Sequence, residues 1–411
     1  MTQWTLDKIQ KLDAEDIFAA KRDEFFLPEG LIYLDGNSLG ALPRAVAKRL
    51  QEVTEKEWGG SLIAGWNVHS WIDLPSRVGD MLAGLIGADP GEVVLAESTS
   101  INLFKALTAA LQAGPKRGTI LTEEGNFPTD LYVLDAIARH SGGAVKIKRV
   151  AAAALEENLT DEVAILCLTH SNFKTSRKHN MAALTKAAKE VGALTVWDLS
   201  HSAGAMPVDL NGCGVDYAVG CGYKYLNSGP GGPGYIFVAK RHQDKLDPVL
   251  AGWMGHIRPF DFSGDYEPAD GILRQLTGTP DVMGAAALEA ALGVFDNVDM
   301  AALYRKAQAL GDLFLDLVLE SCPELELGCP RNADDRGSQV TLKHAHGYAI
   351  IQAVIAKGLV GDFRSPDVLR FGFAPLYNSY TDVWNAAAIL AEVMDERVWE
   401  TPDFQARKKV T

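Results

Sequence analysis

The chain has 411 residues, of which 47% are apolar and 22% are charged, and its formal net charge is −14. This length and composition predict a sizeable core, arranged either as one large domain with a smaller one attached or as two domains. The negative charge argues against a surface that binds nucleic acid or an anionic membrane, and it suits a soluble enzyme.

The cysteines are few, odd in number and without a C-x-x-C pair: Cys167, Cys213, Cys221, Cys322 and Cys329. We expect reduced thiols in a cytoplasmic protein, with neither a disulfide framework nor a zinc site. The first 18 residues are polar and charged, unlike a signal peptide, and no apolar run approaches the roughly 20 residues that span a bilayer. His344 and His346 have no evident third ligand, so no metal is expected.

Through the middle of the chain, short apolar runs typical of buried strands alternate with helical patterns. The strand-like runs are residues 92–98, 119–124, 163–170, 193–200, 217–222 and 234–240, and the helical patterns are residues 100–111, 130–140 and 181–192. This alternation predicts an α/β fold with a mostly parallel sheet covered on both faces. Only a loop separates the last two strand-like runs, so one of them can run antiparallel.

After about residue 295 the pattern changes to that of a smaller α+β unit. A long amphipathic helix is predicted at residues 299–322, and further elements follow at residues 337–344, 348–364, 368–374 and 382–396. We therefore expect a large domain at residues 60–294 and a small domain built from residues 1–59 and 295–411.

Polar residues follow several predicted strands, where open α/β sheets bind ligands. Thr99 and Ser100 open a helix after the first strand, which makes an anion site or an ordinary helix cap. After the second strand, Phe127 and Asp130 enter another helix. They suit an aromatic cofactor, although the alternatives are a core ring and a cap.

Two charged residues end later strands. Asp198 closes a buried apolar strand, where a carboxylate is costly unless it is paired with a cation. The alternatives are a cap, a lysine partner, or a protonated heterocycle nitrogen. Lys224 follows 26 residues later in a glycine-rich turn, where burial and nearby cations can lower its pKa until the amine condenses with an aldehyde. An ion pair with Asp198 is the alternative.

Together these groups form a phosphate cradle, a ring stacker, a partner for a pyridinium nitrogen and an amine, the set that pyridoxal 5′-phosphate requires. Lys174 is a rival amine, but it precedes the aspartate strand and has no glycine turn. Residues 229–234 fit G-x-G-x-x-G, but two prolines and a following strand argue against a dinucleotide site. Arg370 lies on a predicted strand and can bind a substrate carboxylate with its fork, or form a surface salt bridge.

The chain resembles the kynureninases, fold-type I pyridoxal-phosphate enzymes of the aspartate aminotransferase-like superfamily. The matching segments run nearly end to end in family order: YLDGNSLG (33–40), STSINLFKAL (98–107), NFPTDLY (126–132), LTHSNFKT (168–175), WDLSHSAGA (197–205), GCGYKYLNSGPG (220–231), GWMGH (252–256), GTP (278–280) and LRFGFAPLYNS (369–379). The resemblance implies a mostly parallel, seven-stranded-type sheet flanked by helices. It also implies hydrolysis of L-kynurenine to anthranilate and L-alanine, as in tryptophan degradation and the synthesis of NAD.

The resemblance further implies a role for each matching residue. Lys224 would form the Schiff base, Asp198 would pair with the pyridinium, and Tyr223 would donate a proton or only bind phosphate. The other implied cofactor-binding residues are Thr99, Ser100, Phe127, Pro128, Thr129, Asp130, Thr169, His201, Trp253 and Thr279. Trp253 and Thr279 match positions that reach the cofactor from a neighbouring subunit, which implies a homodimer. The implied substrate-binding residues are Arg370, Ser38 and Trp66.

Two departures refine this expectation. Trp66 and Thr279 replace a histidine and an asparagine of animal-type members, which points to the bacterial type and to kynurenine over 3-hydroxykynurenine. The nearest alternative is another fold-type I enzyme, a cysteine desulfurase or an aminotransferase. A desulfurase needs a nucleophilic cysteine, for which Cys329 is the only plausible candidate, and it typically carries histidine where this chain has Tyr223. A non-enzymatic phosphate-ligand binder on this fold, such as a regulator, is a further alternative, but no DNA-binding extension or basic patch is evident.

Overall fold

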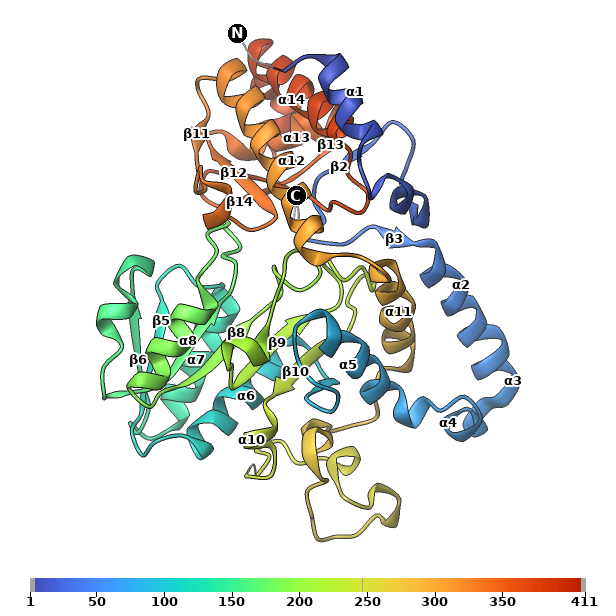
Figure 1. The fold of residues 1–411 in the computed structure, drawn as a ribbon, viewed down its shortest axis with the longest axis vertical. Coiled ribbons are helices and arrows are strands. Elements are labelled where there is room, and N and C mark those ends of the chain that lie inside the picture. The colour runs from blue at the N-terminus through green and yellow to red at the C-terminus, as the bar shows by residue number, and fades with distance from the viewer. Residues whose placement is uncertain (1–3, 246, 408–411) are drawn as a thin grey trace.

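The computed structural model describes residues 4–245 and 247–407. Figure 1 shows a large sheet with its helices in the lower half and the C-terminal helices and strands above it. Within the described ranges, no helix combines the length and the apolar character that crossing a membrane would require.

Seven strands form the large sheet, in the spatial order β4 (Val93–Leu95), β10 (Gly234–Val238), β9 (Tyr217–Cys221), β8 (Leu194–Asp198), β7 (Val163–Thr169), β5 (Thr119–Glu123) and β6 (Lys146–Val150). From β9 to β6 all neighbours are parallel, whereas β10 is antiparallel to both β9 and β4. The predicted α/β class with a mostly parallel sheet is therefore confirmed. The edge strand β6 was not predicted, because its sequence KIKRV is half-exposed and polar.

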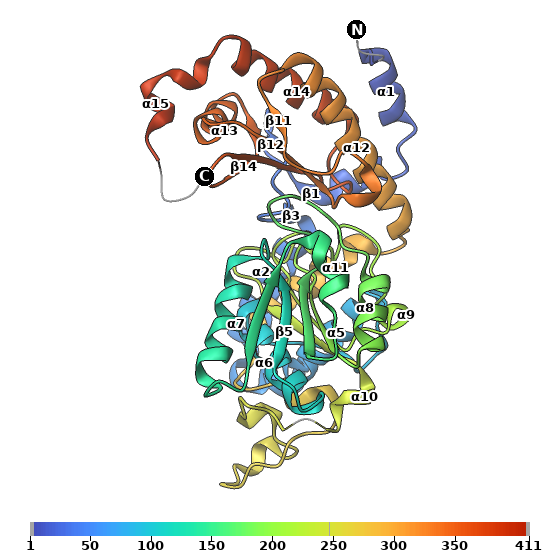
Figure 2. The ribbon, with the colours of Figure 1, turned by 90° about the vertical axis from the view of Figure 1, so that its left-hand side faces the viewer.

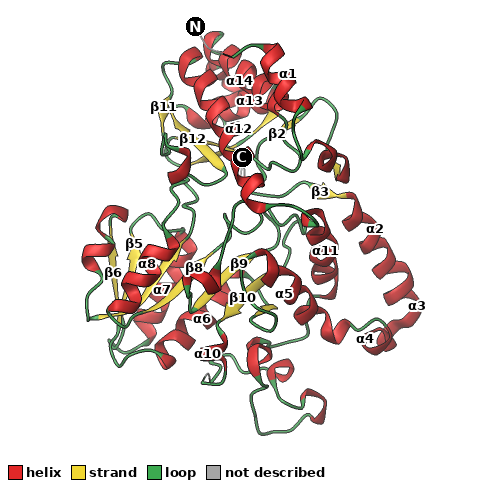
Figure 3. Ribbon diagram, viewed as in Figure 1, coloured by secondary structure: helices red, strands yellow, loops and turns green. Residues whose placement is uncertain are grey.

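Helices cover both faces of this sheet (Figures 2 and 3). On one face lie α6 (Thr99–Ala113) and α7 (Pro128–His140), packed with side chains such as Val196. On the other lie α5 (Leu74–Leu85), α8 (Met181–Glu190) and α11 (Val282–Leu292), packed with side chains such as Trp197. Neighbouring strand residues point to opposite faces, so the continuous apolar runs read from the sequence fill two cores.

The C-terminal region forms a four-stranded antiparallel sheet in the order β11 (Glu326–Leu327), β12 (Gln339–Lys343), β15 (Val368–Gly372) and β14 (Asp362–Arg364). Its helices are α12 (Met300–Ser321), α13 (Gly347–Ala356), α14 (Tyr380–Asp395) and α15 (Pro402–Gln405). The remaining short elements are β1 (Phe25–Phe26), β3 (Leu42–Pro43), α3 (Gly59–Ser61), α4 (Gly65–Val68), α9 (Leu210–Cys213) and α10 (Lys240–Gln243).

The N-terminal segment lies against this C-terminal region. Helix α1 (Leu6–Ala14) packs on α14, and β2 (Ile32–Tyr33) pairs in parallel with β13 (Leu359–Val360). Helix α2 (Arg44–Glu52) then crosses to α11, where Val46 packs on Ala287 and Ala291. The proposed domain boundaries after residues 59 and 294 stay a prediction.

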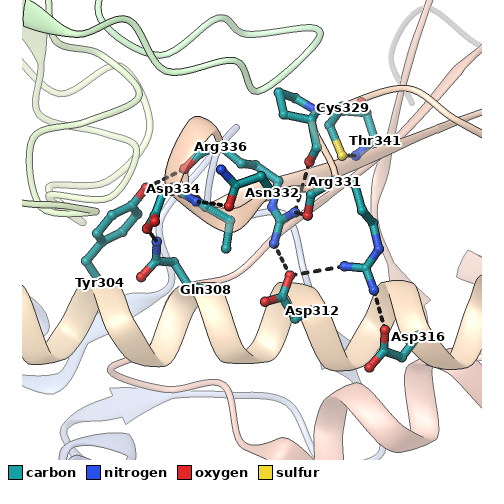
Figure 4. Close-up of polar contacts among 12 residues, drawn as sticks. Tyr304, Gln308, Asp312, Asp316, Cys329, Arg331, Asn332, Asp334, Arg336 and Thr341 are labelled. Carbon is teal, nitrogen blue, oxygen red and sulfur yellow. Dashed lines mark hydrogen bonds and ion pairs between the residues drawn. The ribbon is translucent and has the colours of Figure 1, made fainter.

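Hydrogen bonds and ion pairs hold the loop between β11 and β12 against α12 (Figure 4). Arg336 donates to the Asp312 carboxylate at 2.8 Å, and Arg331 bridges the same carboxylate at 3.3 Å. The Tyr304 hydroxyl donates to the Arg336 carbonyl at 2.5 Å. These contacts fix the start of β12, whose Gln339 amide donates to the Phe173 carbonyl of the large domain at 3.0 Å.

Candidate active site

Lys224 lies in the turn that follows β9, and the N-terminal segment packs directly on this turn. The Gly40 amide donates to the Tyr223 carbonyl at 2.9 Å. A Cβ atom at Gly40 would lie 2.3 Å from the Lys224 carbonyl oxygen, so no larger residue fits there without displacing the turn. The last glycine of the segment YLDGNSLG, Gly40, therefore permits this close approach.

Turns from three strands meet around the lysine amine. Lys224 Nζ lies 3.0 Å from His201 Nε2, 5.7 Å from the Phe127 ring centroid and 5.8 Å from that of Tyr223. Burial, and then the charge of Lys224, lowers the pKa of His201 well below its usual range, so the neutral imidazole accepts a hydrogen bond from the amine. Within residues 4–245 and 247–407, Lys224 and Asp198 form no direct ion pair, so that alternative is not the observed arrangement.

Two buried carboxyl groups lie beside this amine. Asp198 ends β8 and accepts a hydrogen bond from the Ser200 amide at 2.7 Å. Asp130 accepts from the Thr169 hydroxyl at 3.5 Å. Burial raises the pKa of Asp198, and burial followed by the charge of Asp198 raises that of Asp130, although Lys224 acts in the opposite direction on both. Two buried carboxyls next to one lysine fit a second cation, such as a protonated ring nitrogen.

The remaining large-domain residues line the same edge of the sheet. Thr99 and Ser100 are half-buried at the start of α6, where the N-cap Ser98 makes no capping side-chain hydrogen bond. The first amides of this 15-residue helix are therefore available to an anion. Pro128 and Thr129 begin α7, directly after Phe127. These features fit the phosphate and ring of pyridoxal 5′-phosphate.

On the small-domain side, Arg370 and Ser38 are brought together by a residue that sequence analysis missed. Arg370 Nε donates to Asp362 Oδ1 at 2.7 Å, and the Ser38 hydroxyl donates to Asp362 Oδ2 at 2.6 Å. Arg370 also donates to the carbonyl of Phe173, whose ring lies 5.1 Å from that of Phe127, so this cluster lies on the same side as the lysine. Its ion pair is buried rather than a surface salt bridge. The missed signal was a pair of charged residues, Asp362 and Arg364, at alternate positions on either side of Phe363.

Three predicted site residues are not brought to Lys224 within one chain. Trp66 lies on α4, at the lower right of Figure 1, with its ring 6.0 Å from that of Trp71. Trp253 stacks on Phe262 at 5.9 Å in the yellow extension at the bottom of Figure 1. Thr279 lines a cavity of about 240 Å³. Their assigned roles stay predictions.

The rival features of the sequence have structural explanations. Lys174 Nζ donates to the Ser365 carbonyl at 2.9 Å, at an exposed contact. Cys329 is buried, and its sulfur accepts from the Thr341 amide (Figure 4). His346 stacks on Trp399 with ring centroids 4.8 Å apart. In the described ranges, no group of three or more His, Cys, Asp or Glu side chains could hold a metal ion.

The chain is similar to known proteins over nearly its whole length. The model of the kynureninase C-terminal domain matches residues 303–390. The chain is 48% identical over 407 residues to a kynureninase of Pseudomonas fluorescens, covering 97% of this chain and 98% of the relative. It is 46% identical over 414 residues to a kynureninase of Burkholderia pseudomallei, covering 99% and 100%.

Solved structures show the same fold. The cysteine desulfurase CsdA of Escherichia coli matches with a TM-score of 0.78 at 21% identity, over 92% of this chain and 98% of that one. The protein C-DES, solved with glycine covalently linked to its PLP cofactor, matches with a TM-score of 0.77 at 19% identity, over 90% and 99%. At these identities the likeness concerns the fold alone.

Proposed function

The chain belongs to the kynureninase family and hydrolyses L-kynurenine, and we propose that Lys224 is the base at the centre of its active site. The reaction adds water across the Cβ–Cγ bond and releases anthranilate and L-alanine. The observation that carries the assignment is the position of Lys224 Nζ, 3.0 Å from a neutral His201 and beside two buried carboxyls.

Pyridoxal 5′-phosphate is the cofactor that these residues fit. Lys224 would hold its aldehyde carbon, Asp198 its ring nitrogen and Phe127 its ring face. When bound, the cofactor supplies an electron sink that acidifies the substrate Cα–H and accepts the electrons of the broken bond. The other residues proposed to line it are Thr99, Ser100, Pro128, Thr129, Asp130, Thr169, His201 and Tyr223.

The protein's own groups then bind the substrate and handle its protons. Lys224 Nζ removes the Cα proton, and the half-buried phenol of Tyr223 holds a proton for the substrate, because burial raises the pKa of Tyr223 above its usual value. Arg370 and Ser38 bind the carboxylate side. If Tyr223 only binds phosphate, Tyr223→Phe will lose cofactor affinity and keep normal kcat at saturating cofactor.

A direct assay tests the function. The purified holoenzyme is incubated with L-kynurenine, and anthranilate fluorescence and L-alanine are followed together. Equal amounts of both products, with no requirement for a keto acid, are expected. A dependence on added pyruvate or 2-oxoglutarate would indicate an aminotransferase, and sulfur release from cysteine without anthranilate would indicate a desulfurase.

We also propose a homodimer in which Trp253 and Thr279 reach the partner's cofactor. Phe262 is 74% exposed beside Trp253, which suits a face that is covered in an assembly. Mixing inactive Lys224→Ala subunits with inactive Trp253→Ala subunits should restore some activity, because half of the sites in each heterodimer would be intact. No recovery from a mixture proven to exchange subunits would contradict it.

The proposed physiological setting is cytoplasmic tryptophan degradation, which also supplies NAD synthesis. L-Kynurenine is the proposed preferred substrate, supported by Trp66 and Thr279 in place of the animal-type histidine and asparagine. A higher kcat/KM for 3-hydroxykynurenine than for kynurenine would reject this preference.

A further inference from the structure

The guanidinium of Arg370 is almost fully engaged by the protein itself. Nε and Nη2 donate to Asp362 at 2.7 and 2.5 Å, Nη2 also donates to Ser38 at 2.9 Å, and Nη1 donates to the Phe173 carbonyl at 2.6 Å. Arginine has five N–H groups, so one remains. With its side chain 1% exposed, Arg370 cannot grip a carboxylate with two parallel hydrogen bonds unless it releases an internal partner.

Arg364 lies on the same face of the small-domain sheet but is more exposed than Arg370 and has fewer of its N–H groups engaged. Asp362 pairs with Arg370 across β14 and β15, and Arg364 lies two residues beyond Asp362, so the three side chains share one face. Arg364 Nη2 contacts Asp362 at 2.6 Å, and Nη1 donates to the Phe363 carbonyl at 3.1 Å. Its side chain is 35% exposed, and its Nε has no hydrogen-bond partner among the described residues.

The charges of this cluster favour an added anion. Burial alone would raise the pKa of Asp362, but Arg370 and Arg364 hold it below its usual range, so one ionised carboxylate serves two guanidinium groups. Burial and then repulsion by Arg370 lower the pKa of Arg364. Both arginines also lower the pKa of His201, which touches the Lys224 amine. Arg370 Nη1 donates to the Phe173 carbonyl, the Phe173 ring lies 5.1 Å from the Phe127 ring, and the Phe127 centroid is 5.7 Å from Lys224 Nζ. An α-amino acid held at Lys224 would therefore present its carboxylate to this cluster.

We propose that Arg364 is a second carboxylate-binding residue, whose partly exposed guanidinium binds the substrate α-carboxylate together with the one free N–H of Arg370. Asp362 orients both guanidinium groups and Ser38 links them. This inference rests on the proposed function, because it requires a site that takes an α-amino acid at Lys224. In this arrangement, hydrogen bonds within the protein hold Arg370 in place, and the substrate carboxylate binds mainly to Arg364.

Equilibrium binding of non-reacting ligands to the holoenzyme tests the proposed role of Arg364 in carboxylate binding. The wild type and Arg364→Gln are titrated with L-alanine and with L-alaninamide, which lacks the carboxylate, and the visible absorbance of the bound cofactor is followed. One lost charge-assisted hydrogen-bond pair should raise the Kd for L-alanine about 10- to 100-fold in Arg364→Gln. The Kd for L-alaninamide should be the same in both proteins.

Arg305→Gln is the matched control, because Arg305 is exposed on α12 and lies 3.7 Å from Asp299, far along the chain from the cluster. It should bind both ligands as the wild type does. Arg364→Lys keeps the charge without the fork, so it should bind L-alanine with an intermediate Kd. It also serves as the test if Arg364→Gln does not fold, and unchanged L-alanine affinity in Arg364→Lys would then overturn the proposal.

Two results for Arg364→Gln would overturn the inference. One is an L-alanine affinity within about 2-fold of the wild type, the size of an ordinary surface contact. The other is an equal loss of affinity for L-alanine and L-alaninamide, which would indicate a general structural role. A wild type that binds L-alanine but forms no anthranilate from kynurenine would remove the proposed function and leave the titration of Arg364 valid.

Discussion

On the large-domain side of the site, Asp198 and Asp130 are buried with raised pKa values, and Lys224 is the nearby cation. On the small-domain side, Asp362 is also buried, but two arginines hold its pKa below the usual range. Buried aspartates on the large-domain side therefore share one nearby cation, whereas the buried aspartate on the small-domain side has two.

This difference separates the two binding tasks. Buried carboxyls that lack a full complement of cations suit a cationic heterocycle, which would complete their neutralisation. Two guanidinium groups that share one carboxylate suit an anionic substrate, whose carboxylate would neutralise the second positive charge. Substitutions on the two sides should therefore affect cofactor binding and substrate binding separately.

The largest effect is expected at the amine itself. Lys224→Ala should lower kcat for kynurenine by at least about 10³-fold, because it removes the general base at Cα. The rival lysine is the control: Lys174→Ala should keep normal turnover, since Lys174 Nζ donates to the Ser365 carbonyl at an exposed position. Near-normal turnover in Lys224→Ala, or a loss confined to Lys174→Ala, would move the site to the other lysine.

The next largest effect separates the two carboxyls of the large domain. Asp198→Asn should lower turnover about 10²- to 10⁴-fold, the cost of removing one partner of a buried charge pair. Asp130→Asn should cost no more than about 10-fold, because an amide resembles the protonated form that the raised pKa of Asp130 favours. Turnover and retained cofactor absorbance are measured for both variants.

The reverse order, with Asp130→Asn the more damaging variant, would mean that Asp130 carries the essential negative charge. Equal and small effects would mean that neither carboxyl balances a bound cation. Either result would remove the cationic deficit as the feature that distinguishes the large-domain side.

The sequence was sufficient to predict the large sheet and the residues at its carboxyl edge. Continuous apolar strands and polar strand ends are local features, and Asp198, Phe127, His201 and Lys224 each end or follow a strand of this one sheet. Strand β6 escaped prediction because KIKRV lies at the edge, where burial does not impose an apolar pattern.

The small-domain cluster was harder to predict because it depends on contacts between distant segments. Ser38 meets Asp362 across 324 positions of the chain, and Arg370 reaches the Phe173 carbonyl across 197. Sequence analysis proposed Arg370 as a carboxylate binder but could not indicate that Asp362, Ser38 and Phe173 together occupy four of its five N–H donors. Trp253 and Thr279 would need a second chain to reach a cofactor, so neither one sequence nor one chain tests them.

A smaller, pH-dependent effect is expected from Asp35, beside the cationic cluster. Burial, and then the charge of Asp362, raises the pKa of Asp35 to about 7. Above that pH, Asp35 adds a negative charge next to Arg370 and Arg364 and should weaken carboxylate binding. The KM for kynurenine should rise a few-fold as pH increases from about 6 to about 8, and Asp35→Asn should flatten this change.

The same shift has a definite sign for stability. The folded pKa of about 7 lies above the usual aspartate value of 3.8, so the folded protein keeps a proton that the unfolded chain releases. The stabilising contribution is full below about pH 4 and is lost as pH rises through about 7. Denaturant unfolding should show this decline in the wild type and a flatter profile in Asp35→Asn; identical slopes would contradict the raised pKa.

The smallest effect is expected at Cys329, which lies beside Thr341 on the small-domain side (Figure 4). Burial raises the pKa of its thiol, and its sulfur accepts from the Thr341 amide at 3.4 Å, so it is neither exposed nor activated as a nucleophile. A serine hydroxyl can accept the same hydrogen bond, and Cys329→Ser should keep kynurenine turnover within about 2-fold. A loss comparable to that of Lys224→Ala, in a variant that still unfolds at the wild-type temperature, would place a reacting thiol on the small domain. It would then be that side, rather than the buried carboxyls and lysine of the large sheet, that performs the chemistry.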